Sequence, residues 1–115
     1  MTTPRMRKVD EALRSVISDA IASELQDPRI GFVTVTSVDT SPDLRHARLW
    51  VTVLGDDDER SDTLAGLNSA HGRLQAIIGR EMRLKHTPEL TVLYDSSIDT
   101  GMRVGELLDL EEGNR

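Results

Sequence analysis

The side chains best suited to ligand chemistry in this 115-residue chain are basic residues spaced along one predicted helix. Arg73, Arg80 and Arg83 follow at i, i+7 and i+10, so they fall within about 80 degrees of one another on a regular helix. Lys85 extends this basic run. Guanidinium and ammonium groups arranged in this way can bind the phosphate oxygens of a nucleic acid. The alternative is that they only solvate the helix or pair with acids such as Glu81.

A second basic group lies near the N-terminus, in a helix that the apolar spacing predicts. Arg7 and Arg14 are seven residues apart and therefore share a face, and Lys8 lies beside them. Spacing alone favours a solvated surface over contact with RNA. We name these three residues as candidate neighbours of the main basic face.

The residue types that carry catalysis or hold metals form no recognisable motif. The chain has no cysteine, and His46, His71 and His86 are scattered without metal-ligand spacing. His71 falls close to an apolar stripe, which favours a packed role. The acidic run 55–60 lacks the ligand pattern of a calcium loop, and we predict a solvated turn there. The sequence therefore predicts no enzyme, no metal site and no cofactor.

The distribution of charge is more informative than its sum. The net charge of −6 argues against a nucleic-acid partner when it is taken as one number. Basic residues nevertheless outnumber acidic ones in 1–14 and 73–86, whereas acids dominate 55–62 and 87–115. Such segregation is compatible with one basic face on an acidic protein. A small acidic domain that docks a basic protein, or a divergent hydrolase, remains an alternative.

Hydrophobic periodicity predicts the elements that position these groups. A helix runs from Pro4 to Leu25 and ends before Pro28, because the residue before proline disfavours helical angles. Two β-branched runs, 32–38 and 45–54, predict antiparallel strands. Trp50 falls on the more polar face of the second strand, where it could stack on a base or shield a sheet edge or a core rim.

The central stretch 63–85 predicts a long helix with a bend. One core stripe comprises Leu64, Leu67, Leu74, Ile78 and Met82. Gly72 lowers helical propensity and permits the bend, so a larger side chain there is expected to clash or to restrict the backbone.

A third strand at 90–94 follows, and the helical crossover predicts that it runs parallel to the second. A last helix is predicted through Ile98, Met102, Leu107 and Leu108. The order predicts an α+β two-layer domain with a three-stranded mixed sheet packed by helices. We expect one domain at 1–110 and a short frayed acidic tail at 111–115.

An ordered set of short segments supports a more specific interpretation. The chain resembles the bacterial ribosome-binding factor A family over nearly its whole length. The matching segments are Asp27–Arg29, Val33–Thr36, Asp43-Leu44 with Ala47, Ala70–Gly72, Met82–Lys85, Thr87–Leu90, Tyr94–Ser97 and Gly101–Arg103.

The resemblance implies a KH-like (type II) fold with an interhelical Ala-x-Gly bend at Ala70, His71 and Gly72. Ordinary KH domains clamp nucleic acid with a Gly-x-x-Gly loop, which this chain lacks. The resemblance also implies binding to structured rRNA of the immature 30S subunit and support of its maturation, including rRNA processing. No apolar run could span a membrane, and no signal peptide is evident. We therefore expect a cytoplasmic protein without a membrane partner. We also expect it to be monomeric.

Overall fold

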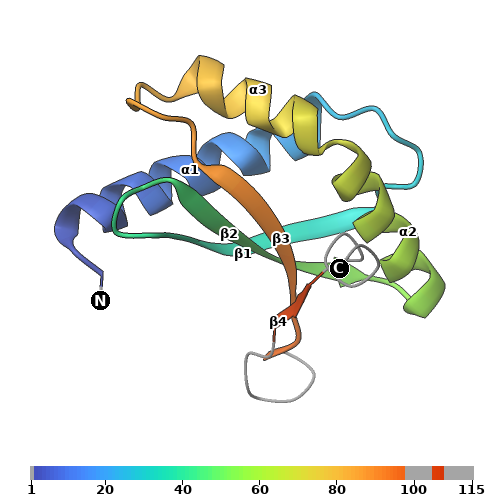
Figure 1. Cartoon of the computed structure of the whole chain (residues 1–115). Helices are drawn as coiled ribbons and strands as arrows, with labels where there is room; N and C mark the ends of the chain where they lie inside the picture. Colours follow the sequence, from blue (N-terminus) through green and yellow to red (C-terminus); the bar gives the residue numbers. More distant parts are fainter. Residues whose placement is uncertain (1, 98–104, 108–115) are drawn as a thin grey trace.

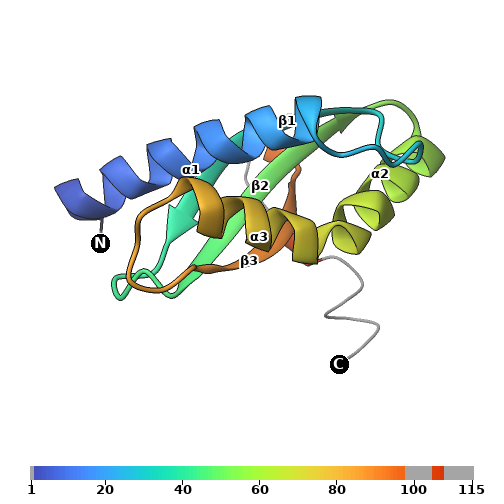
Figure 2. The same cartoon turned by 90° about the horizontal axis from the view of Figure 1, so that it is seen from above.

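The computed structural model describes residues 2–97 and 105–107, which form two layers. Three helices cover one face of a sheet, and α1 and α3 lie side by side across it (Figures 1 and 2). The helices are α1 (Pro4–Ser23), α2 (Asp57–Ser69) and α3 (His71–Glu81). The strands are β1 (Phe32–Thr40), β2 (His46–Leu54), β3 (Glu89–Asp95) and β4 (Gly105–Leu107). The α+β two-layer prediction is confirmed.

The sheet is mixed and has the order β1-β2-β3-β4. β1 pairs with β2 antiparallel, from Phe32 opposite Leu54 to Thr40 opposite Ala47, with a register shift between Val35 and Ser37. β2 and β3 run parallel, as the helical crossover between them predicts. The three predicted strands are therefore present, and β4 adds a short fourth strand antiparallel to β3.

The predicted last helix is wrong where it reaches β4. Leu107 pairs with Leu93 and Gly105 pairs with Asp95, so this segment is extended. Glycine disfavours a helix, and pairing with β3 supplies the backbone with hydrogen bonds that compete with a helix. The other predicted helix positions, Ile98, Met102 and Leu108, lie outside the described residues, as does the predicted tail 111–115.

The acidic run before the central helix is a helix start rather than a loop, so that prediction is wrong for residues 57–60. Asp56 is the N-cap, and its carboxylate accepts a hydrogen bond from the Glu59 amide at 2.8 Å. The Glu59 carboxylate accepts in return from the Asp56 amide at 2.9 Å. This reciprocal capping box satisfies free amides, and acids in the first turn complement the helix dipole.

The predicted bend separates two helices, and it falls at Ala70 within the Ala70–Gly72 segment. Ala70 ends α2 and begins α3, with φ −89° and ψ 6°. Gly72 lies in the first turn of α3, and a Cβ added there would meet no atom within 4 Å. The expected clash at Gly72 is therefore wrong, because that side of the helix faces open space.

α3 also ends earlier than predicted. Its last residue is Glu81, and Met82 is extended with ψ 141°. Met82 and Leu84 both pack against the core although they are only two residues apart. A helix would rotate two such residues about 200° from each other, so an extended segment is needed to place both inward. Arg83 and Lys85 consequently lie in the connection to β3.

The core lies between the sheet and the helices. Leu13 and Ile17 of α1 meet Leu74 and Ile78 of α3 over Leu49 and Val51 of β2, among other apolar residues. Trp50 lies on the other face of β2, because neighbouring strand residues alternate. It is 7% exposed, and its indole Nε1 donates to Asp39 Oδ2 at 2.9 Å. Burial leaves little of the ring for a base, and β2 is an inner strand, so Trp50 does not shield a sheet edge either.

Candidate nucleic-acid interface

The two predicted arginines that lie on α3 differ in their surroundings. Both are exposed on the helix surface. Arg80 donates to Glu24 Oε2 and to Glu81 Oε2, both at 3.0 Å, and these hydrogen bonds, led by the one to Glu81, raise its pKa. Arg73 has no acidic partner among residues 2–97 and 105–107. The pairing alternative therefore describes Arg80, and Arg73 keeps an uncompensated charge.

Arg83 and Lys85 lie in the connection 82–88 rather than on the predicted helical face. Both side chains are exposed. Within the described part of the chain, neither forms an ion pair. Their charges therefore face solvent at the end of α3, although the shared helical face predicted for Arg83 is wrong.

Arg7 and Arg14 share a face of α1, whereas Lys8 points away from it. Arg14 donates to Glu11 Oε1 at 2.9 Å and lines a hollow between α1 and β1. Arg7 and Lys8 are exposed near the start of the helix. Lys8 lies about 100° from Arg7, so the three side chains span a broad arc and form no narrow stripe.

Three further groups surround Lys85 in a second hollow that the sequence analysis did not identify. Arg5 comes from the start of α1, Arg45 from the turn between β1 and β2, and His86 from the α3–β3 connection. Asp43, Leu44 and Leu84 complete the lining. We call Arg5, Arg45, Lys85 and His86 the basic cluster. It combines three segments that are far apart in sequence, at Arg5, Arg45 and Lys85-His86, so no spacing rule connects them.

The turn that carries Arg45 is rigidly bonded. Leu44 has φ 59°, a left-handed conformation, and it is 7% exposed with its side chain in the core. Its amide donates to the Ser41 carbonyl at 2.8 Å. Asp43 Oδ1 accepts from the Ser41 hydroxyl at 2.6 Å and from the Arg45 amide at 3.0 Å, and these bonds lower the Asp43 pKa. Burial of Leu44 and these bonds together stabilise the unusual backbone.

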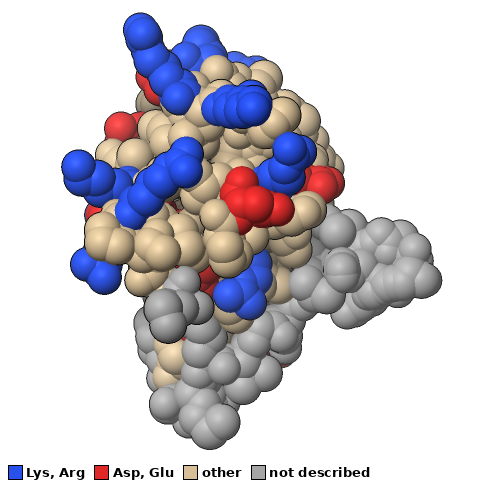
Figure 3. Space-filling model, turned by 60° about the vertical axis from the view of Figure 1, so that its left-hand side comes forward, with Lys and Arg blue, Asp and Glu red and all other residues tan. Residues whose placement is uncertain are grey.

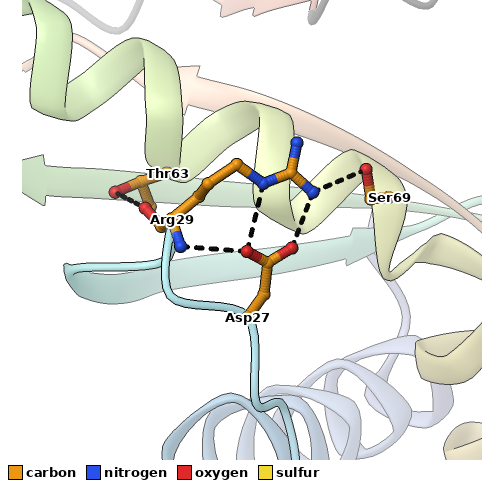
Figure 4. Close-up of polar contacts among 4 residues, drawn as sticks. All are labelled: Asp27, Arg29, Thr63 and Ser69. Atoms are coloured by element: carbon orange, nitrogen blue, oxygen red, sulfur yellow. Dashed lines mark hydrogen bonds and ion pairs between the residues drawn. The ribbon is translucent and has the colours of Figure 1, made fainter.

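A polar network joins the segment after α1 to the end of α2 (Figure 4). The Arg29 guanidinium donates to both Asp27 oxygens, at 3.1 and 2.6 Å, and to the Ser69 hydroxyl at 3.0 Å. The bonds from Arg29 lower the Asp27 pKa to about 2. Thr63 accepts from the Gly31 amide at 3.1 Å. Ser69 immediately precedes Ala70, so this network fixes the end of α2 next to the bend.

The middle of the bend packs on β3. His71 is partly buried, and its Nε2 lies 3.1 Å from the Leu90 carbonyl oxygen. The packed role predicted for this histidine is therefore what the structure shows. Gln75 reaches the same strand, donating to the Pro88 carbonyl at 3.0 Å and accepting from the Leu90 amide at 2.7 Å.

The hollow between α1 and β1 differs from the basic cluster in chemistry. Its lining includes Ile21, Leu25 and Phe32, and Leu54 borders it. Phe32 and Leu54 are 79% and 75% exposed. Arg14 is the one basic residue that lines it within the described ranges, and Glu11 pairs with it. This apolar hollow does not suit a phosphate.

Basic side chains spread over the face that includes the left-hand side of Figure 1, whereas fewer acidic side chains are exposed there (Figure 3). In residues 2–97 and 105–107, no three His, Asp or Glu side chains gather closely enough to hold a metal ion. No described helix is long and apolar enough to cross a membrane. The arrangement offers cations for anion binding.

These features define a small α+β domain with a bent helix pair and a basic surface. The sequence model of the family described as ribosome-binding factor A matches residues 5–108. The chain is 45% identical to ribosome-binding factor A of Halothermothrix orenii over 108 residues, covering 94% of this chain and 88% of that protein. It is also 45% identical to the Geobacter metallireducens protein of that name, over 90% of this chain and 88% of the relative. The chain belongs to the ribosome-binding factor A family.

Solved structures agree with this assignment. The Thermus thermophilus ribosome-binding factor A crystal structure is similar with a TM-score of 0.69 and 26% identity, covering 77% of this chain and 93% of that one. A homology model of the Thermus thermophilus factor, fitted into a cryo-EM map of its complex with the 30S subunit, gives a TM-score of 0.62 at 26% identity. It covers 76% of this chain and 91% of the other.

Proposed function

We propose that this chain binds folded rRNA in immature small ribosomal subunits and supports their maturation, including rRNA processing. Membership of the ribosome-binding factor A family carries the proposal. The fitted complex of the Thermus thermophilus factor with the 30S subunit supports the choice of particle. Exposed cations on α1, α3 and the α3–β3 connection supply the charge that RNA binding needs.

We propose that the protein acts by binding rather than by catalysis. We also propose that it is a cytoplasmic monomer with one domain at 1–110. The family name describes binding, and the described residues present exposed basic side chains that suit it. Residues from α1, α3 and the sheet share one core, which supports a single domain.

Folded RNA is the proposed ligand because the connection between α2 and α3 reads Ala70-His-Gly72. A Gly-x-x-Gly clamp, the usual grip on four single-stranded nucleotides, is absent from this sequence. Co-sedimentation with 30S precursors, compared with affinity for short unstructured oligomers, tests the proposal. We expect preference for the particle. Equal or tighter binding of the oligomers would contradict it. An affinity for 30S precursors that does not change with salt concentration would favour docking on a protein.

The proposed contact surface includes Arg73, Arg83 and Lys85, with Arg7 and Lys8 as neighbours. Arg80 and Arg14 contribute less, because Glu24, Glu81 and Glu11 already compensate their charges. Each phosphate contact removed lowers the log-log salt slope of binding by about 0.9 on duplex and about 0.7 on single strands.

Arg73→Ala and Arg83→Ala, compared with Arg80→Ala, test this surface. We expect the first two to reduce the salt slope of 30S binding more than the third. Exposed substitutions of this kind change stability by only about 0.5 kcal/mol, and thermal melts check the fold. Equal slopes in all three variants would move the contact surface elsewhere.

A further inference from the structure

Three separate parts of the chain bring the basic cluster to one hollow. Arg5 is in the first turn of α1, Arg45 directly precedes β2, and Lys85 and His86 follow α3. These elements meet at one end of the two layers, where the N-terminus of α1 lies near the turns of the sheet (Figure 2). Convergence of cations from unrelated segments creates a repulsive site that an anion would relieve.

The cations of the cluster lack the acidic partners found elsewhere on the surface. Arg14, Arg29, Arg48 and Arg80 each lie within 4 Å of a carboxylate oxygen. Arg5, Arg45 and Lys85 form no ion pair with any residue in 2–97 or 105–107. Asp43 also lines the hollow and its charge acts on Arg45, but it forms no ion pair with that guanidinium, so one carboxylate faces three cations.

Arg45 is held at both its backbone and its side chain. Its carbonyl accepts from the Glu89 amide at 2.9 Å, and its amide donates to Asp43. Its guanidinium Nη2 lies 3.1 Å from His86 Nε2. Arginine has only donors, so the imidazole Nε2 accepts in this contact. The bond uses one guanidinium nitrogen and leaves other N–H groups available to a ligand.

The left-handed backbone of Leu44 indicates that the turn before Arg45 is held in one conformation. A non-glycine residue at φ 59° is uncommon and is retained where the surroundings over-determine it. Its buried side chain anchors the turn, and Arg45 projects from the next position. The turn therefore fixes the backbone of Arg45, and the contact with His86 restrains its guanidinium, which reduces the entropy lost on binding.

We infer that the basic cluster binds a backbone phosphate of folded RNA, with Arg45 as its principal ligand. We call this site the phosphate seat. Arg5 and Lys85 flank the phosphate, and His86 positions the Arg45 guanidinium. A planar guanidinium can donate two parallel hydrogen bonds to phosphate oxygens. The inference rests on the proposed function and adds to it residues from the β1–β2 turn and the start of α1.

Arg45→Gln tests the seat, and Arg48→Gln is its matched control. Arg48 lies three residues away, is 62% exposed and faces Asp39 at 3.7 Å. Binding to 30S precursors is measured from about 50 to 200 mM salt. Loss of one phosphate contact changes the log-log salt slope of binding by about 0.9. The ratio of parental to Arg45→Gln affinity should therefore fall by about 3.5-fold as the salt rises from about 50 to 200 mM. Arg48→Gln should leave the ratio nearly constant.

The positioning role of His86 needs a separate readout. His86→Phe removes the acceptor without changing a formal charge, whereas His86→Gln retains one through its amide oxygen. We expect weaker 30S binding with an unchanged salt slope for the Phe variant, and recovery for the Gln variant. Equal affinity of both variants and the parent would exclude the positioning role.

The outcomes separate the seat from the proposed function. If the parental protein binds 30S precursors and Arg45→Gln behaves like Arg48→Gln, the seat is wrong and the function stands. If the parental protein does not bind precursors, the function fails. Calorimetric titration with inorganic phosphate distinguishes the ligand source. Saturation at micromolar phosphate would overturn an RNA seat, and its absence supports one. Thermal melts of each variant confirm that the fold persists.

Discussion

Asp27 and Arg29 illustrate how a short motif stabilises a local structure. The arginine forms a fork with both carboxylate oxygens and also reaches Ser69 on α2 (Figure 4). The sequence flags Asp27-Pro-Arg29 only through family resemblance, because its main partner outside the motif is 40 residues away. No periodicity connects such positions, so the network could not be predicted from the sequence alone.

Asp27 should make the free energy of unfolding depend on pH. Its pKa in the folded protein is lowered to about 2, so its contribution is fully present above the ordinary value near 3.8 and is lost as the pH falls through about 2. We expect Asp27→Asn to flatten the decline in unfolding free energy between about pH 4 and pH 2. Urea denaturation across this range measures it.

Asp19→Asn is the control for that experiment, because Asp19 is exposed on α1 and its carboxylate bonds to no described residue. Its pH profile should follow the parental one. Profiles of equal steepness for the parent and Asp27→Asn would show that the fork contributes nothing to stability.

The glycine that requires close packing is Gly66 rather than Gly72. A Cβ at Gly66 would lie 2.7 Å from Ile30 Cγ1 and 3.4 Å from Arg29 Cβ, whereas one at Gly72 meets nothing within 4 Å. Alanine gains up to about 1 kcal/mol of helix propensity, and overpacking costs about 1–3 kcal/mol. We expect Gly66→Ala to lose about 1–2 kcal/mol and Gly72→Ala to lose none, measured by urea denaturation. A Gly66→Ala protein as stable as Gly72→Ala would refute the close contact.

The main elements could be predicted where one physical signal dominates. Apolar spacing located α1, and β-branched alternation located β1 and β2. The start of α2 was missed because Asp56 and its acidic neighbours were interpreted as a charge run, although Asp56 and Glu59 have capping-box spacing. The end of α3 was missed because Met82 fits the helical stripe equally well, and only the packing of Leu84 decides against it.

Single substitutions should reveal how much the capping box of α2 contributes to the free energy of unfolding. Asp56→Ala removes the acceptor for the Glu59 amide, and loss of an N-cap costs about 1 kcal/mol. Asp56→Ser keeps an acceptor at the same position and should stay close to the parental stability. Chemical denaturation of both variants provides the comparison. An Ala variant that matches the Ser variant would mean that α2 does not depend on this cap.

Gln75 couples α3 to the start of β3 through two hydrogen bonds. Gln75→Leu leaves the Leu90 amide and the Pro88 carbonyl without this partner, and an unsatisfied buried group costs about 1–3 kcal/mol. We expect a loss of that order in unfolding free energy. Gln75→Glu keeps an acceptor for Leu90 and should lose less. The reverse ranking would show that the side-chain bonds are replaced by water.

The basic surface could be predicted in part from charge segregation. The blocks 1–14 and 73–86 both contribute cations to it, because α1 and α3 lie side by side on the sheet (Figure 2). Arg45 was missed because it belongs to neither block and reaches His86 only through the fold. Pairing within the surface was also unpredictable in detail, since Arg80 meets Glu24, which caps the end of α1. Sequence locates charged segments, and tertiary packing determines which charges are compensated.

The whole domain should unfold in one step, although its two sheet faces differ. Leu49 and Val51 face the helices, while Trp50 lies between them on the opposite face and is 7% exposed. Trp50 is the one tryptophan in the sequence, so its fluorescence reports that face alone, whereas far-UV circular dichroism reports the helices. Because both faces share β2, we expect coincident urea transitions with a slope of about 1–3 kcal/mol per molar. A fluorescence transition at lower urea than the circular dichroism transition would divide the predicted single domain into two cooperative units.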